Sequence, residues 1–390
     1  MFTKNFKRTL QDDCLWLMRI ISLDLIQKRP MILLLKVTFV GLTILTMLQT
    51  YLFLQRFDAY YFVKYVAVYA TSYCLLLAIF SIPYLLKSSM AGLDHIEHWR
   101  INFCGPKLEK RIKTEALYFN GFAVSVAILS YVNAAIYAKP LENDEDIFYP
   151  LAIFKEFVPQ WQNVLSALYR ATFFLIPLIL TTPCYILIYI TSHLRFQFYM
   201  LLHFLKNINN EYETTEPNQL VDNLHYQKEI TRRLKFCIRR YSILYTTFHK
   251  VKRELNIFVF LFSIVGDMLV LSCMVYFVLF QELMEDRWMR LMTMIITMVL
   301  GILHVVLAGQ LVENITSRAF DILRQLDWYC WNSENKMLYL IFLGNATHNF
   351  KIKYSDSLSL NYELVGSMVK WIYSIGAVMV KLRHIDYSNH

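Results

Sequence analysis

The sequence predicts an all-α integral membrane protein with seven transmembrane helices. Of its 390 residues, 56% are hydrophobic and only 18% are charged, whereas about 25% of the residues of a soluble domain are charged. The apolar residues also gather into runs of about 20 residues, the length that a helix needs to cross the hydrocarbon core of a bilayer. This composition excludes a disordered chain and disfavours an ordinary soluble enzyme.

Seven runs are long and apolar enough to be transmembrane helices. They cover residues 31–54, 61–86, 116–138, 165–190, 256–280, 288–311 and 360–382. None shows the alternation of polar and apolar residues that is typical of a transmembrane β-strand. Two prolines inside the fourth run, Pro177 and Pro183, predict a kink in that helix.

The basic residues between the runs predict the orientation of the chain. Lys and Arg number six in residues 1–30, six between the second and third runs, and eleven between the fourth and fifth. The connection 139–164 instead holds two basic residues against five acidic ones, and 281–287 is also acidic. Because basic connections favour the cytoplasmic side, we expect a cytoplasmic N-terminus and an extracellular C-terminus. A G-protein-coupled receptor has the opposite orientation.

The cytoplasmic connections are themselves helical in pattern. Apolar residues recur at spacings of three and four through 194–205 and 234–248, which predicts that helices four and five extend beyond the membrane. Such a helical layer either covers the helix ends or joins subunits, and the sequence leaves both interpretations open. The expected order is a cytoplasmic segment (1–30), transmembrane helices one to four (31–190), cytoplasmic extensions with a loop (191–255), helices five and six (256–311), a cytoplasmic anchor segment (312–359), helix seven (360–383) and an extracellular tail (384–390).

No motif in the chain predicts catalysis, and we expect neither a cofactor nor a metal. The sequence has no phosphate-binding glycine loop, no paired-cysteine zinc site and no nucleophile elbow. The net charge of +9 fits the cytoplasmic bias of basic residues better than nucleic-acid binding. Asp267 lies in the middle of the fifth run, where a buried, neutral or paired carboxyl group is favoured over a ligand-binding role. His304 is a candidate partner for it.

Aromatic and small residues at helical spacing are the candidate ligand-binding residues. An apolar, aromatic-lined cavity with few polar groups suits a small volatile molecule, although such stripes are more often ordinary packing. The candidates lie in the predicted outer halves of helices two, three and four. They are Tyr65, Tyr69 and Ser72; Ile128, Tyr131 and Ala135; and Tyr169, Phe173 and Ile176.

The layout and the C-terminal sequence resemble the insect odorant receptor family. The shared features are seven helices with a cytoplasmic N-terminus, about 390 residues, and long cytoplasmic extensions of the middle helices. The last helix resembles that of the family in its Tyr373–Ser374 pair and apolar end, and Trp328 and Trp331 resemble the aromatic residues that precede it. The Thr-Tyr and Gln-Phe signature of the related gustatory receptors is absent from this helix.

The resemblance implies an odorant-gated, non-selective cation channel in the plasma membrane of an olfactory sensory neuron, passing monovalent cations and calcium. The chain lacks the long insertion between helices four and five that marks the family's co-receptor. It therefore resembles a tuning subunit that binds a small volatile odorant, aromatic or heterocyclic, and forms a heterotetramer with the co-receptor. An inverted metabotropic chemoreceptor and a membrane transporter remain the alternatives.

The resemblance also implies roles for the last helix, which lines the central pore in the family. Val378 and Leu382 are four residues apart and share one helix face, and they match the family's apolar constriction. We expect them to form the gate. Lys381 and Arg383 would lie at the pore mouth and place positive charge there.

Overall fold

The computed structural model describes residues 13–55, 58–94, 99–142, 144–210, 217–279, 288–347, 350–352 and 359–388, and the described part is built from helices. Six of its helical stretches are long and apolar enough to cross a membrane: Arg29–Gln55, Lys64–Leu93, Pro106–Ala138, Pro159–Lys206, Leu224–Met274 and Trp288–Arg324. Each stretch overlaps one of the first six predicted runs, so the expectation of an all-helical membrane protein is confirmed. The seventh run lies in a helix that is not among the six.

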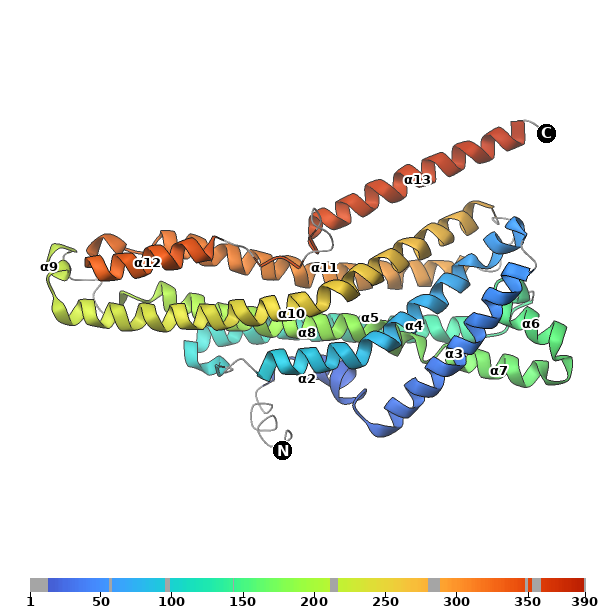
Figure 1. Cartoon of the computed structure of the whole chain (residues 1–390), viewed down its shortest axis with the longest axis horizontal. Helices are drawn as coiled ribbons and strands as arrows, with labels where there is room; N and C mark the ends of the chain where they lie inside the picture. Colours follow the sequence, from blue (N-terminus) through green and yellow to red (C-terminus); the bar gives the residue numbers. More distant parts are fainter. Residues whose placement is uncertain are drawn as a thin grey trace.

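The long helices are α3 (Arg29–Gln55), α4 (Ala59–Asp94), α5 (Pro106–Ala138), α8 (Ile176–Lys206), α10 (Leu224–Leu279) and α11 (Trp288–Arg324). Most of the long helices run along the longest axis of the molecule, and α3 lies obliquely to it (Figure 1). The central helix is α8, which contacts α4, α5, α10 and α11. Its side chains are buried almost without interruption from Leu178 to Leu202 because neighbours cover it on every side.

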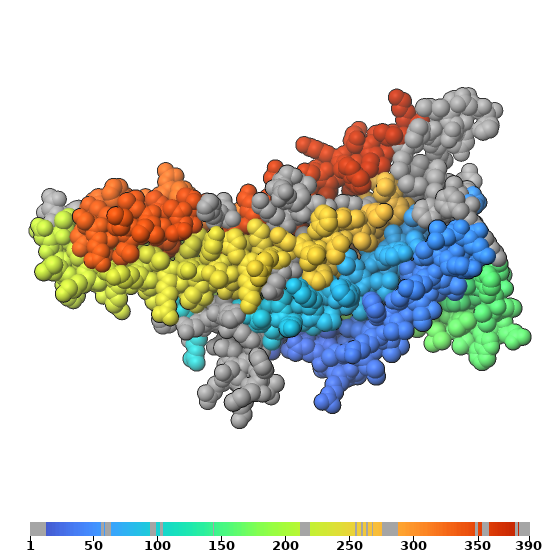
Figure 2. Space-filling view, viewed as in Figure 1, coloured from blue at the N-terminus to red at the C-terminus, as the bar shows by residue number. Residues whose placement is uncertain are grey.

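Shorter elements pack on the side and at the two ends of the bundle. On the side, α2 (Trp16–Arg19) contacts α5 and α8, and the π-helix η2 (Ile20–Asp24) contacts α8; η3 (Ile101–Cys104) precedes α5. One end holds η4 (Asp144–Asp146), α6 (Tyr149–Phe157), η5 (Pro159–Trp161) and α7 (Gln162–Thr172) (Figure 1). The far end of α10 is flanked by α9 (Pro217–Val221), η8 (Trp328–Cys330) and α12 (Ser333–Ala346). In Figure 2, α12 lies along the far half of α10, and the two helices are in contact.

The fourth apolar run is broken rather than kinked, which corrects the sequence-based expectation. Helix α7 ends at Thr172, three residues form turns, and α8 begins at Ile176. Pro177 lies in the first turn of α8, where a missing backbone N–H has no cost because that group lacks a helical partner anyway. Pro183 lies within α8 without ending it.

The last helix, α13 (Tyr362–Ser388), diverges from the bundle (Figure 1). It contacts α10 and α11, and its Gly376 faces the Met274 side chain of α10. Several large side chains along it are nevertheless exposed, namely Tyr362, Val369, Trp371, Ile372, Tyr373 and Val378. A single copy of the chain therefore leaves much of the apolar surface of α13 uncovered.

Candidate functional site

The break between α7 and α8 lies within a cluster of aromatic side chains. Phe173 caps α7 and is buried; its ring centroid lies 5.3 Å from that of Phe148 and 5.2 Å from that of Tyr169. Tyr137 of α5 packs edge-on against both Phe148 and Phe173. We call Tyr137, Phe148, Phe154, Tyr169 and Phe173 the aromatic cluster. Val68 and Ile176 pack against it, so five helices (α4 to α8) and the connections at Phe148 and Phe173 contribute to this apolar region.

The candidates on helix two lie in an adjoining group. Tyr65 and Tyr69 pack with Phe53 and Tyr149; the ring centroids of Phe53 and Tyr149 are 4.8 Å apart and nearly parallel. The Tyr65 hydroxyl donates to the Glu145 carbonyl at 2.9 Å, and the Tyr69 hydroxyl lies 2.6 Å from Thr50 Oγ1. These phenols combine an apolar ring with a fixed polar end.

Ser72 has a local role in its own helix. Its hydroxyl donates to the Val68 carbonyl at 3.2 Å, four residues earlier in α4. This bond satisfies the donor within an apolar bundle. Because Val68 packs against the aromatic cluster, this bond places Ser72 next to the cluster.

The helix-three candidates are not brought together with the others. Ile128 and Tyr131 are 60% and 43% exposed, and Ala135 is also exposed. Another face of the same helix, α5, points into the bundle. On that face Asn133 accepts a hydrogen bond from Thr293 of α11 at 2.8 Å, and the Tyr137 hydroxyl lies 3.5 Å from the Met294 sulfur.

A buried carboxylate fixes the connection between α5 and α6, next to the aromatic cluster. Asp144 Oδ1 lies 2.7 Å from Arg290 Nη1 of α11, and Asp144 Oδ2 lies 2.7 Å from Arg170 Nη1 of α7. The Leu141 amide donates to the same carboxylate at 3.0 Å. The side chains of Asp144 and Arg290 are only 2% and 4% exposed. We call Asp144, Arg170 and Arg290 the Asp144 clamp.

The Asp144 clamp is also joined to the aromatic cluster. The Arg290 guanidinium lies 5.5 Å from the ring centroid of Tyr137, where the electron-rich face attracts a cation. Arg290 also donates to the carbonyls of Ile136 and Lys139 near the end of α5. A displacement of the aromatic cluster would therefore shift contacts of α5, α7 and α11 together.

Sequence reasoning missed most of these residues. Asp144 lies in an acidic stretch that is typical of a solvated loop, and only its contacts distinguish it from its neighbours. The inward face of α5 had a weak signal, since Ser130, Ala134 and Tyr137 are spaced by four and three residues. Nothing in the sequence ranked that face above the one that carries Ile128 and Tyr131.

His304 is buried in α11 among aromatic rings, 4.6 Å from the Phe122 centroid and 6.1 Å from that of Tyr185. Its Nε2 atom has no hydrogen-bond partner among the described residues. The side chain of Asp267 lies outside the described residues, so its pairing with His304 stays a prediction.

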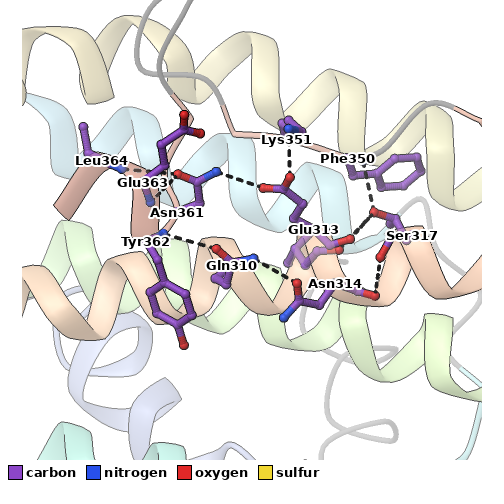
Figure 3. Close-up of polar contacts among 12 residues, drawn as sticks. Gln310, Glu313, Asn314, Ser317, Phe350, Lys351, Asn361, Tyr362, Glu363 and Leu364 are labelled. Carbon is purple, nitrogen blue, oxygen red and sulfur yellow. Dashed lines mark hydrogen bonds and ion pairs between the residues drawn. The ribbon is translucent and has the colours of Figure 1, made fainter. Parts of the chain in front are cut away.

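A polar network joins the start of α13 to α11 (Figure 3). Asn361 Oδ1 accepts from the amides of Glu363 at 3.1 Å and Leu364 at 3.4 Å, as a helix N-cap does. The Asn361 side-chain amide donates to Glu313 Oε2 at 3.2 Å, and Glu313 Oε1 lies 2.8 Å from Lys351 Nζ. The first turn of α13 is therefore held by α11.

The same junction requires a glycine. A Cβ atom on Gly309 of α11 would lie 2.1 Å from the Leu360 carbonyl oxygen, which is well inside van der Waals contact. The chain entering α13 therefore lies directly against the α11 backbone. The Tyr362 amide also donates to Gln310 Oε1 at 3.2 Å (Figure 3).

The predicted gate is only partly within the described side chains. Val378 and Lys381 are exposed on α13, while Leu382 and Arg383 lie in α13 with side chains that are not among those described. In this single chain Val378 contacts no core cluster of the described residues.

A second buried carboxylate ties the beginning of the described chain to α8. Asp13 accepts from the Tyr189 hydroxyl at 2.7 Å and the Leu15 amide at 2.9 Å, and it lies 3.3 Å from His193 Nε2. Burial raises the pKa of Asp13, but the hydrogen bonds and the charge of His193 outweigh it and lower the pKa from 3.8 to about 2.

No protein-family model and no curated protein matches the sequence. Solved structures match the fold over nearly the whole chain, and two of them are of the same receptor. The insect olfactory receptor OR5 from Machilis hrabei aligns with a TM-score of 0.67 at 12% identity, covering 97% of this chain and 99% of that one. Its complex with eugenol aligns with a TM-score of 0.69 at 12% identity, covering 96% and 98%. This chain is thus an all-helical membrane protein with the fold of an insect olfactory receptor.

Proposed function

We propose that the chain is the odorant-binding subunit of an odorant-gated, non-selective cation channel. The observation that carries this proposal is the agreement in fold with an insect olfactory receptor along nearly the full length of both chains. We propose no enzymatic role, because the fold is that of a receptor. The N-terminus would be cytoplasmic, as the distribution of basic residues predicts.

The ligand would bind at the aromatic cluster. Its rings come from separate elements that meet where α7 gives way to α8, and its few polar neighbours include Asn133, Thr293 and the Tyr137 hydroxyl. A small apolar molecule with one polar group suits such a lining. That the Machilis hrabei receptor was solved with eugenol supports an aromatic volatile as the ligand class. From α5, the contacts would come from the Asn133 and Tyr137 face.

The pore would be built from copies of α13. This helix exposes apolar side chains that a single chain leaves uncovered, so we propose it as the seventh transmembrane helix. Val378 and Leu382 would form rings that exclude water from a narrow passage. Lys381 and Arg383 would place positive charge at the mouth, and a shared co-receptor in a heterotetramer would dilute that charge. Ligand binding would favour the open state through differential affinity.

The test of the proposed function is co-expression with an insect co-receptor under voltage clamp, with a panel of volatiles. We expect odorant-evoked cation current in the cell, and also in excised patches without nucleotides. Current that requires nucleotides would favour a metabotropic receptor, and uptake of substrate without current would favour a transporter. Expression without the co-receptor should give little current, and robust current from the chain alone would contradict the heterotetramer.

The gate has a separate test. Val378→Cys and Leu382→Cys are exposed to a membrane-impermeant thiol reagent, with Tyr373→Cys on a different face of α13 as the control. Modification at the two gate positions should change the current at a rate that depends on odorant, and modification of the control should not. Inert cysteines at both positions would move the gate elsewhere.

A further inference from the structure

An open groove of about 390 Å³ runs along the first turns of α5. Its lining is one face of the helix, made of Pro106, Glu109, Lys110, Lys113, Thr114 and Leu117. Gly105, with a φ of 84°, turns the chain into the helix, and Pro106 occupies the first turn. This groove is far from the aromatic cluster, because the cluster's α5 residue, Tyr137, lies at the other end of the helix.

The groove has an excess of positive charge. Lys110 and Lys113 face it, Lys107 lies beside it, and all three are exposed. Glu109 is the acidic residue of the lining and lies 2.5 Å from Lys113 Nζ. Within the described part of the chain, neither Lys107 nor Lys110 makes an ion pair. Exposed ion pairs contribute little, so the pair with Glu109 does not prevent Lys113 from contacting a second anion.

The adjoining face of α5 does not neutralise this charge. Arg111 lies 3.0 Å from Glu115, and the buried Arg195 of α8 lies 3.1 Å from the same carboxylate. Two guanidinium groups therefore share one carboxylate on that face. The field of this helix end stays positive over the groove.

The polarity of α5 changes within one turn at the end of the groove. Leu117 lines its last part, and Leu117 and Tyr118 are 70% and 74% exposed. The predicted apolar run of this helix begins at residue 116. Cations followed at once by exposed aliphatic and aromatic side chains are typical of the headgroup level of a bilayer. The predicted orientation places this end in the cytoplasmic leaflet, whose lipids carry negative charge.

We propose that this groove binds the phosphorylated headgroup of a phosphoinositide of the cytoplasmic leaflet. Lys110 and Lys113 would contact phosphate oxygens, the Thr114 hydroxyl would donate to one of them, and the acyl chains would lie along Leu117 and Tyr118. Lys113 favours a phosphate over the Glu109 carboxylate, because a phosphate carries more negative charge than one carboxylate. The inference needs the predicted orientation but not the channel function.

The test measures binding of a fluorescent, short-chain phosphatidylinositol bisphosphate to the full chain in phosphatidylcholine nanodiscs. Lys110→Gln/Lys113→Gln should weaken binding at least about tenfold, since each lysine near an anionic lipid contributes roughly a factor of five. The matched control Lys228→Gln/Lys235→Gln removes the same charge from two exposed positions on α10 and should change affinity less than twofold. Equal losses in the two double variants would overturn the proposal.

Two further variants separate binding from misfolding. Lys110→Arg/Lys113→Arg keeps the charge and should retain binding. Glu109→Gln removes the acidic residue of the groove lining and should tighten binding, a gain that a damaged fold cannot produce; unchanged or weaker binding would contradict the assigned contacts. Free inositol trisphosphate should compete weakly, and competition as strong as that of the lipid would show a soluble phosphate site instead.

Discussion

Replacing Asp144 with asparagine removes one negative charge from a buried position while nearly preserving the shape of the side chain. Asp144 lies 2.7 Å from both Arg290 and Arg170 and accepts from the Leu141 amide. The carbonyl oxygen of asparagine can still accept the hydrogen bond from the Leu141 amide. The substitution nevertheless leaves Arg290 buried without a counter-charge. Breaking a buried ion pair by removing one partner costs about 3–5 kcal/mol.

The neighbouring residue Glu145 supplies the matched control. Its carboxylate lies 2.7 Å from Lys155 Nζ, and the side chains of Lys155 and Glu145 are 61% and 36% exposed, against 2% for Asp144. Glu145→Gln should therefore cost at most about 1 kcal/mol. The Tyr65 hydroxyl bonds to the Glu145 backbone carbonyl, so this contact survives the substitution.

The assay is thermal unfolding of the purified chain, followed with a thiol-reactive dye. The described cysteines are all free and are buried or half-buried, so they react on unfolding. We expect Asp144→Asn to lower the Tm by at least about 5 °C, since each kcal/mol shifts the Tm of a large domain by about 2 °C. Removing the stranded charge as well, in Asp144→Asn/Arg290→Gln, should recover part of this loss.

A Tm for Asp144→Asn within 1 °C of that of Glu145→Gln would refute the reasoning. So would a Tm for Asp144→Asn/Arg290→Gln that is no higher than the Tm of Asp144→Asn. Either result would mean that the clamp is solvated in the membrane-embedded protein and holds no buried charge.

Two other predictions concern Gly309, which lies against the chain entering α13, and Asp13, which lies near the beginning of the described residues. Gly309→Ala should lower the Tm and the yield of folded protein, because its Cβ would lie 2.1 Å from the Leu360 carbonyl oxygen. Gly301→Ala on the same helix meets nothing within 4 Å and should stabilise the helix by up to about 1 kcal/mol; equal Tm values for the two variants would contradict the close approach. The depressed pKa of Asp13 should contribute about 2 kcal/mol at neutral pH, and this contribution is lost as the pH falls below 3.8 through about 2. Asp13→Asn should therefore be less stable than the wild type at pH 7 and converge with it in acid, and a constant difference across this pH range would exclude the linkage.

The class of the protein and the approximate positions of its long helices could be predicted from the sequence. A run of about 20 apolar residues needs no distant partner to identify itself, because its length and hydrophobicity already favour a helix in lipid. Six of the predicted runs lie in helices that can span a membrane. The break at Phe173 was missed because proline indicates a disturbed helix but does not determine whether it bends or stops.

The candidate site depended on tertiary structure. A stripe at helical spacing shows that residues share a face, but not whether that face points inward, and α5 buries the face of Ala134 rather than that of Ile128. The burial of Asp144 arises only when α7 and α11 bring two guanidinium groups to it from distant parts of the sequence. Likewise, Asn361 donates to Glu313 only because α11 packs against the start of α13. Local sequence determined which segments are helical in the membrane, and contacts between distant residues decided which side chains meet.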